Sequence, residues 1–216
     1  MTKTQLVLWG ASDHATVVAD VIRQQGVYDI IGYLDDVRPE RAGEAFCGAT
    51  VLGGREQLPL LRGRGISHVV MAFGDNQRRL NLGALVLNEG CELATAVHPA
   101  AIIAADVRIG HGTVVMAGVV INPGTVIGQH AIINTAAVIE HGCQIGDGAL
   151  INSRSCIAGN VTVERAATVE IGAIVASGLR IGAAAVVGAG SLVLKDVPEA
   201  TLVYGSPAKV IKKFEP

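Results

Sequence analysis

The residue types that could do chemistry gather at a few places in this chain. His141 stands in the segment AIINTAAVIEHGCQIG, residues 131–146, where it interrupts a regular pattern of aliphatic residues. Three polar clusters nearer the N-terminus each follow a short apolar run, at residues 10–14 (GASDH), 35–36 (DD) and 74–76 (GDN). An imidazole can act as a general base near neutral pH, and a loop that opens a helix can hold a phosphate.

The three polar clusters occur within a pattern of alternating strands and helices. Strand-like apolar runs occupy residues 4–10, 28–36, 50–53 and 67–75, and helical spacing occupies residues 14–26, 56–65 and 76–90. Such alternation predicts a small parallel sheet covered by helices, a Rossmann-like α/β domain over residues 1–95. Ligands of open α/β sheets bind beyond the carboxyl ends of the strands, and the polar clusters lie at those ends.

The first cluster only partly resembles a phosphate-binding loop. Gly10 is its only glycine, so the GxGxxG motif of dinucleotide sites is absent and a dinucleotide cofactor is weakly supported. An ordinary turn with a helix cap at Ser12 or Asp13 is the alternative interpretation.

From residue 97 onward the hydrophobic period changes to six. Every sixth residue from Val97 to Val193 is isoleucine or valine, and a small residue usually stands two positions earlier. This pattern is typical of the hexapeptide repeats of a parallel β-helix. Three hexads per triangular coil give a prism about 25 Å tall at the ~4.8 Å spacing of strands. Stacked side chains fill its interior, so a functional site must lie on the outer faces.

Composition excludes several classes of function. Half of the 216 residues are hydrophobic but only 3% are aromatic, which suits tightly stacked small and β-branched side chains. A net charge of −2 and a pI near 6.3 favour neither nucleic acid nor an anionic membrane as a partner. No apolar run reaches the ~18 residues of a spanning helix, and the first residues lack a signal peptide's apolar stretch. We expect a cytoplasmic protein.

The histidines and cysteines do not suggest a metal site. The four cysteines show no CxxC spacing, and no histidine stands at zinc-finger distance from them. His111 has the same place in its hexad as His141, but the two are not a whole number of coils apart and therefore lie on different faces. We expect no metal and reduced, mostly buried thiols.

Five segments resemble the bacterial nucleotide-sugar N-acetyltransferases of the hexapeptide-repeat superfamily, which acetylate substrates such as UDP-4-amino-4,6-dideoxy sugars and GDP-perosamine. They are LVLWGASDHATVV (6–18), MAFGDN (71–76), VMAGVVINPGTVIG (115–128), AIINTAAVIEHGCQIGD (131–147) and VVGAGSLVLKDVPEATLVYGSPAKVI (186–211). The likeness covers nearly the whole chain. It implies a left-handed β-helix over residues 96–216, a homotrimer, and acetyl-CoA bound between neighbouring helices.

The resemblance also implies roles for particular residues. His141 matches the family's catalytic histidine, a general base that takes a proton from the sugar amine. The residues matched to the nucleotide-sugar site are Ser12, Asp13, His14, Asp35, Asp36, Gly74 and Asn76. Those matched to the coenzyme's track are Leu150, Gly159, Ile171 and Ala189. The implied reaction moves acetyl from acetyl-CoA to the 4-amino group of a UDP- or GDP-linked 4-amino-6-deoxysugar, for surface polysaccharide or glycan synthesis, and needs no metal.

Three positions depart from the family's pattern. Gly142 stands where the family commonly has Glu or Asp after the histidine, so a partner for the imidazole must come from Glu140, from a backbone carbonyl, or from nowhere. Leu150 replaces a frequent second histidine, and Asp13 adds a carboxylate to the first polar loop. Two alternatives stay open: O-acetylation of a sugar hydroxyl, as in sialic acid O-acetyltransferases, and a non-catalytic scaffold that binds a nucleotide sugar.

Overall fold

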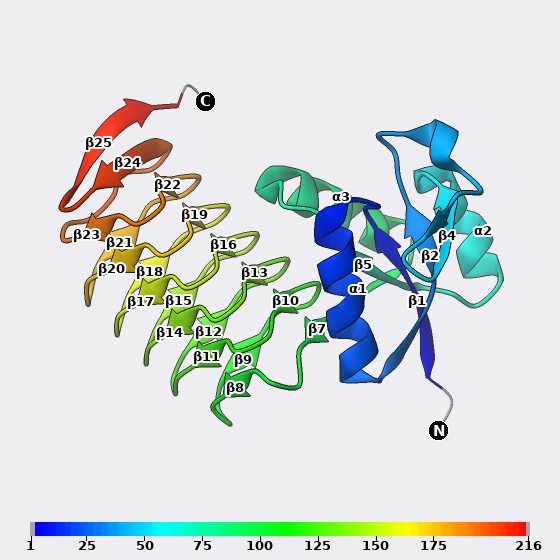
Figure 1. The fold of residues 1–216 in the computed structure, drawn as a ribbon, viewed down its shortest axis with the longest axis horizontal. Coiled ribbons are helices and arrows are strands. Elements are labelled where there is room, and N and C mark those ends of the chain that lie inside the picture. The colour runs from blue at the N-terminus through cyan, green and yellow to red at the C-terminus, as the bar shows by residue number, and fades with distance from the viewer. Residues whose placement is uncertain (1–2, 215–216) are drawn as a thin grey trace. The chain divides into compact units, whose positions relative to one another are not determined.

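The computed structural model describes residues 3–214, and the chain divides into two compact units between residues 99 and 100. The first unit alternates strands and helices (Figure 1). Its strands are β1 (Thr4–Trp9), β2 (Tyr28–Leu34), β3 (Ala45–Phe46), β4 (Ala49–Gly53), β5 (His68–Met71), β6 (Glu92–Leu93) and β7 (Ala96–Val97). Its helices are α1 (Asp13–Gln25), α2 (Leu58–Gly63) and α3 (Asn76–Asn88), with 3₁₀ turns η1 (Pro39–Arg41) and η2 (Arg55–Gln57).

The strands of the first unit form a mostly parallel sheet. Their order is β3-β4-β2-β1-β5-β6, and β1 pairs in parallel with both β2 and β5. Only the β3–β4 hairpin is antiparallel. The predicted parallel α/β unit is therefore confirmed, while the short strands β3 and β6 were not predicted because a strand of two residues carries no periodic signal.

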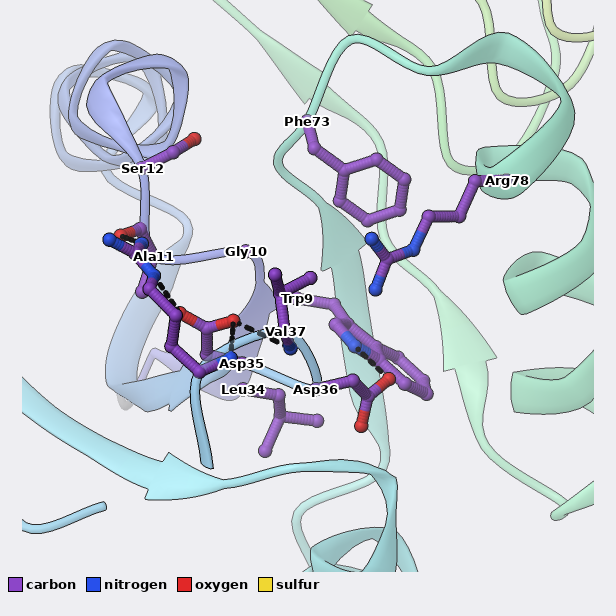
Figure 2. A pocket seen from close by; sticks show the side chains of 11 residues that line it. Trp9, Gly10, Ala11, Ser12, Leu34, Asp35, Asp36, Val37, Phe73 and Arg78 are labelled. Atoms are coloured by element: carbon purple, nitrogen blue, oxygen red, sulfur yellow. Dashed lines mark hydrogen bonds and ion pairs between the residues drawn. The ribbon is translucent and has the colours of Figure 1, made fainter. Parts of the chain in front are cut away.

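The carboxyl ends of β1, β2 and β5 bring three loops together. Because the strands are parallel neighbours, the loops at residues 10–12 and 35–38 lie beside Phe73, which follows β5 (Figure 2). Helix α1 begins directly after the first of these loops and ends at Gly26, whose left-handed backbone (φ 75°) lets its N–H bond to Ile22. The sheet thus places the polar clusters at residues 10–14 and 35–36 at the same edge, as the sequence predicted.

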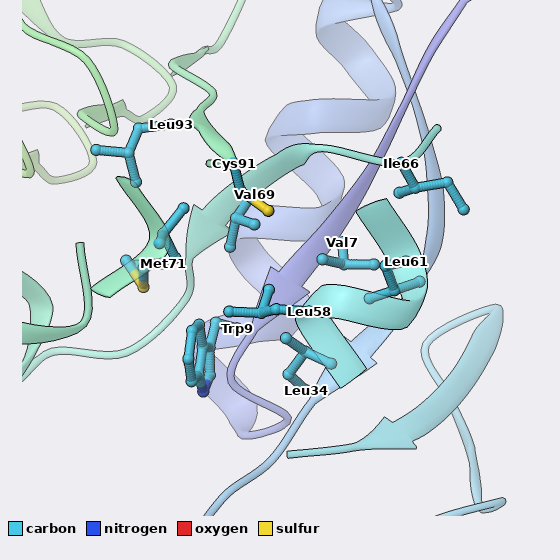
Figure 3. Close-up of a cluster of buried hydrophobic side chains, with 11 residues drawn as sticks. Val7, Trp9, Leu34, Leu58, Leu61, Ile66, Val69, Met71, Cys91 and Leu93 are labelled. Atoms are coloured by element: carbon cyan, nitrogen blue, oxygen red, sulfur yellow. The ribbon is translucent and has the colours of Figure 1, made fainter. Parts of the chain in front are cut away.

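The core of this unit lies between the sheet and its helices. Trp9 and Leu34 of the central strands pack with Leu58 and Leu61 of α2 and with Met71 of β5 (Figure 3). All five are at most 3% exposed. This packing holds the carboxyl ends of the strands in place, because buried side chains tolerate little displacement.

The second unit is a parallel β-helix built from two-residue strands. These are β8 (Ile102–Ile103), β9 (Arg108–Ile109), β10 (Val114–Val115), β11 (Val120–Ile121), β12 (Val126–Ile127), β13 (Ile132–Ile133), β14 (Val138–Ile139), β15 (Gln144–Ile145), β16 (Leu150–Ile151), β17 (Cys156–Ile157), β18 (Thr162–Val163), β19 (Thr168–Val169), β20 (Ile174–Val175), β21 (Arg180–Ile181), β22 (Val186–Val187) and β23 (Leu192–Val193). A hairpin of β24 (Thr201–Gly205) and β25 (Ala208–Lys213) ends the unit.

Three sheets form the faces of this helix. Over residues 100–214 we name them the β14 sheet (β23-β20-β17-β14-β11-β8), the β15 sheet (β21-β18-β15-β12-β9) and the β16 sheet (β25-β24-β22-β19-β16-β13-β10). Val138 pairs with Val120 on one side and Cys156 on the other, so one coil takes three hexads, as predicted. The isoleucine or valine at every sixth position from Ile121 to Val187 is at most 2% exposed and fills the interior.

The outer faces of the sheets differ in polarity. On the β14 sheet every outward position is apolar or a cysteine, namely Ile102, Val120, Val138, Cys156, Ile174 and Leu192. On the β15 sheet the outward row is mainly polar or charged, namely Arg108, Val126, Gln144, Thr162 and Arg180. No helix within residues 3–214 is long and apolar enough to cross a bilayer.

Candidate active site

Loops after β1, β2 and β5 enclose a pocket in the first unit (Figure 2). It is lined by Trp9, Gly10, Ala11, Ser12, Leu34, Asp35, Asp36, Val37, Arg38, Phe73 and Arg78. Its volume is about 210 Å³, below the ~300–1,000 Å³ of clefts that enclose a whole ligand. The pocket therefore suits one end of an extended ligand. Of the predicted nucleotide-sugar residues, it contains Ser12, Asp35 and Asp36.

Asp35 is buried, and its carboxylate is already bonded inside the protein. One oxygen accepts the backbone N–H groups of Val37 (3.0 Å) and Arg38 (3.2 Å). The other meets the guanidinium groups of Arg38 (3.3 Å) and Arg41 (3.5 Å). Both arginines also donate to the carbonyl of Ala11. Asp35 thus ties the loop after β2 to the loop after β1 and shapes the pocket wall.

Asp35→Ala should destabilise the first unit, because two backbone N–H groups and two guanidinium groups lose their acceptor. We expect the free energy of unfolding to fall by about 1–3 kcal/mol, measured by urea denaturation. The control is Asp29→Ala, whose side chain is 59% exposed and pairs only loosely with Lys3 at 3.8 Å. Equal stability of the two variants would contradict this anchoring role.

Asp36 differs from its neighbour because its carboxylate faces the pocket. One oxygen accepts the indole N–H of Trp9 (3.1 Å) and the other accepts the backbone N–H of Arg55 (2.7 Å). Figure 2 shows the carboxylate at the wall of the pocket beside the Trp9 ring. Each oxygen keeps a free lone pair, so Asp36 can still accept hydrogen bonds from a ligand.

The start of α1 places the next three predicted residues. Ser12 is the N-cap residue, but its hydroxyl makes no capping bond. Asp13 is the first residue of the helix, where a carboxylate is favourable against the helix dipole. Burial, followed by the positive charge of Arg79, lowers the pKa of His14, so its imidazole is neutral at pH 7. The Nε2 atom of His14 is buried without a hydrogen-bond partner among residues 3–214.

Gly74, in the loop after β5, and Asn76, the first residue of α3, lie outside the pocket. Arg79, only 1% exposed, donates to the Gly74 carbonyl (2.8 Å) and to the Asn76 side-chain oxygen (2.9 Å). Burial lowers the pKa of Arg79 to about 10, still well above neutral, so the guanidinium stays charged. Through these hydrogen bonds, Arg79 holds the loop after β5 to the start of α3.

Trp9, Phe73 and Arg78 were missed as site residues by the sequence interpretation. The Arg78 guanidinium lies 5.3 Å from the centre of the Phe73 ring, a cation–π contact at the pocket wall (Figure 2). Their position in the sequence could have identified the two aromatic residues. Trp9 ends β1 and Phe73 follows β5, in a chain with one tryptophan and three phenylalanines. Rare aromatic residues at strand ends are candidates for ligand stacking.

His141 is exposed in the turn that follows β14 of the second unit. Its ring lies against Gly159, the residue in the same place one coil further along. A Cβ atom at Gly159 would come within 2.7 Å of ring atoms Cε1 and Nε2. The backbone of Gly159 does not have a positive φ, so a side chain is excluded there by the imidazole alone. Gly159 thus gives the ring its space.

Gly142 stands where a side chain would have to displace that of Asn160. Its φ is 70°, and an added Cβ would lie 2.4 Å from the side-chain oxygen of Asn160. The carboxylate of Glu140 is also not directed at the imidazole, because Asn122 donates to it at 2.7 Å from the preceding coil. In the part of the chain that the structure describes, no side chain acts as the hydrogen-bond partner of His141.

The four residues predicted for the coenzyme lie on different parts of the β-helix. Gly159 shares a corner with His141, on one side of the β14 sheet. Ile171 (56% exposed) and Ala189 stack one coil apart at the opposite corner of that sheet. Leu150 points outward from β16 on the next sheet. One chain alone therefore does not gather all four around a single ligand.

No group of three His, Cys, Asp or Glu side chains within residues 3–214 is arranged to hold a metal ion. All four cysteines are free, and burial raises the pKa of the Cys91 and Cys143 thiols. Both stay protonated at neutral pH and are poor nucleophiles.

Comparison with known proteins defines the class to which this fold and site belong. Residues 5–84 match the family model of the PglD N-terminal domain. PerB from Caulobacter crescentus, solved with CoA and GDP-perosamine, is 38% identical over 98% of this chain and 99% of its own, with a TM-score of 0.92. The acetyltransferase domain of PglB from Neisseria gonorrhoeae, solved with acetyl coenzyme A, is 29% identical over 97% of this chain and 100% of its own, with a TM-score of 0.87. A search of curated proteins gives no match.

The class is that of acyltransferases with a left-handed β-helix. Structures of the Caulobacter crescentus perosamine N-acetyltransferase with one histidine replaced by asparagine or alanine also match over 98% of this chain. WeeI from Acinetobacter baumannii, 24% identical with a TM-score of 0.78 over 96% of this chain and 100% of its own, shares the fold. The chain belongs to the hexapeptide-repeat nucleotide-sugar N-acetyltransferases.

Proposed function

We propose that this chain transfers acetyl from acetyl-CoA to the 4-amino group of a nucleotide-linked 4-amino-6-deoxysugar, with His141 as general base. The observation that carries the proposal is the exposed imidazole seated on Gly159 in a chain with 38% identity to a GDP-perosamine N-acetyltransferase over nearly its full length. We propose a cytoplasmic reaction that serves surface polysaccharide or glycan synthesis, because acetyl-CoA and nucleotide sugars are cytoplasmic metabolites.

The chemistry requires positioning and one base. The amine nitrogen attacks the thioester carbonyl, His141 removes the proton from the attacking nitrogen, and CoA leaves as the thiolate. An amine is already a nucleophile, so orientation supplies most of the rate, and a base adds about 10²–10⁴. The nucleotide end is assigned to the first unit, with Ser12, Asp13, His14, Asp36, Gly74 and Asn76 as its predicted contacts and Asp35 as the anchor of its wall.

We propose a homotrimer, because the outer face of the β14 sheet is an apolar surface in a single chain. Its row of six outward residues spans about 24 Å at the ~4.8 Å strand spacing, and Ile102 and Ile174 are 69% and 49% exposed. Such a surface favours burial against another copy. His141 and Gly159 lie at one border of this sheet and Ile171 and Ala189 at the other. Packing of neighbouring copies can therefore bring the two borders to one acetyl-CoA.

The direct test is CoA release with a defined acceptor. Wild-type protein is mixed with acetyl-CoA and a nucleotide-linked 4-amino-4,6-dideoxysugar, and free thiol is measured. The matched analogue with a hydroxyl at C4 should react at least about 100-fold more slowly, since a hydroxyl must be deprotonated to attack. Faster turnover of the hydroxyl analogue would favour O-acetylation, and no release with either would favour the scaffold alternative.

Gly159→Ala should reduce kcat by about 10- to 100-fold, because the new methyl group displaces the imidazole and a shift of ~1 Å can have that effect. The control is Ser177→Ala, in the same column one coil further along, where the hydroxyl bonds only to the Gly159 carbonyl (2.7 Å). Steady-state kinetics would test both. An unchanged kcat in Gly159→Ala would show that the observed ring position is not the catalytic one.

A further inference from the structure

We propose that the pocket formed by Asp36, Arg78 and Phe73 binds the nucleobase and selects guanine over uracil, thymine and cytosine. This inference rests on the proposed function, in which the first unit holds a nucleotide sugar. It concerns which base that unit accepts.

The pocket suits a base better than a phosphate. Its volume, about 210 Å³, accommodates only one end of a nucleotide sugar. The Phe73 ring and the Arg78 guanidinium are both partly buried and planar, and bases stack on planar groups of this kind. Asp36 contributes a negative charge that would repel a phosphate. The free N–H groups at the start of α1 suit the phosphates instead.

Two charged groups in the pocket lack an oppositely charged partner. Within residues 3–214, neither Asp36 nor Arg78 forms an ion pair, whereas the charge of neighbouring Asp35 is matched by Arg38 and Arg41. Asp36 has spare lone pairs beyond the bonds from Trp9 and Arg55. The Arg78 guanidinium lies at the pocket wall and makes no hydrogen bond to the other residues drawn in Figure 2. A ligand that offers both donors and acceptors would satisfy both groups.

Guanine matches this pair of groups better than the other bases do. Its N1–H and N2–H₂ are adjacent donors that one carboxylate can accept together, and its O6 and N7 atoms are the acceptors that arginine binds in pairs. Cytosine and adenine offer a carboxylate only an exocyclic amine. Uracil and thymine offer one N–H between two carbonyl oxygens, which a carboxylate repels. The second donor of guanine is therefore the selective feature.

The test is calorimetric titration of the full chain with GDP, IDP, UDP, dTDP, CDP and ADP. IDP lacks only the N2 amino group of guanine. We expect GDP to bind about 10-fold more tightly than IDP, and more tightly still than the pyrimidine nucleotides, since a hydrogen bond to a charged group is commonly worth a factor of this size. This comparison needs no variant, so it does not depend on the folding of a mutant.

Asp36→Asn then tests the assignment to this carboxylate. The amide keeps the shape and one acceptor oxygen, so we expect the GDP-to-IDP ratio to fall to within about threefold while UDP affinity changes little. The exposed acid Asp20 of α1, bonded to Gln24, provides the control Asp20→Asn. That control should keep the wild-type ratio.

The outcomes separate the inference from the proposed function. Equal or tighter binding of UDP, dTDP or CDP, or an unchanged GDP-to-IDP ratio in Asp36→Asn, would overturn the assignment of guanine and leave the acetyltransferase proposal intact. Absence of binding by every nucleotide, together with acetyl transfer to a nucleotide sugar, would overturn the pocket assignment only. Absence of both would overturn the proposed function as well.

Discussion

His141→Ala is expected to lower kcat by about 10²–10⁴ while the affinity for acetyl-CoA stays nearly the same, because a general base acts in the transition state. The ring is exposed, seated on Gly159, and has no side-chain partner within residues 3–214 that would oppose its use as a base. Steady-state kinetics give kcat, and calorimetry with CoA gives the affinity. Added imidazole should restore part of the lost rate.

His111→Ala is the matched control for this experiment. His111 is also exposed, also begins a turn and is also followed by a glycine, but it lies after a strand of the β15 sheet. We expect its kcat to stay within about twofold of wild type. If His141→Ala also kept its rate within that margin, His141 would be an ordinary surface residue and the proposed base would be wrong.

Val138→Glu is expected to leave a monomer in place of the proposed trimer and to reduce activity at least about 100-fold, since it would bury an unpaired carboxylate at the proposed interface. Val138 points outward in the middle of the β14 sheet, three residues before His141. Light scattering gives the mass, and CoA release gives the activity. Both should fall together if the coenzyme site is shared between copies.

Gln144→Glu supplies the control on another face. Gln144 occupies the corresponding outward position of β15, in a row that is mainly polar, and it is exposed. The same charge there should leave both mass and activity unchanged. A Val138→Glu protein of trimeric mass would show that the β14 sheet is not the interface. A monomer with full activity would show that one chain is sufficient for the coenzyme.

The repeat pattern by itself determined the architecture of the second unit. An isoleucine or valine every sixth residue specifies which side chains point inward, and a shift of one residue would expose the whole interior row. The same is true of the parallel α/β unit, whose apolar runs and glycine stops define its long strands and helices. These signals are local and periodic, so they can be recognised in the sequence without a structure.

The tertiary structure alone decided how the polar residues are used. Asp35 and Asp36 are adjacent and chemically identical, yet one is bonded to Arg38 and Arg41 and the other faces a pocket beside Trp9. The same holds for Glu140, which Asn122 engages from the preceding coil, and for Gly142, where Asn160 occupies the space of a side chain. Each outcome depends on a neighbour distant in sequence or one coil away, and on the direction of a side chain. Residue type and spacing indicate neither that neighbour nor that direction.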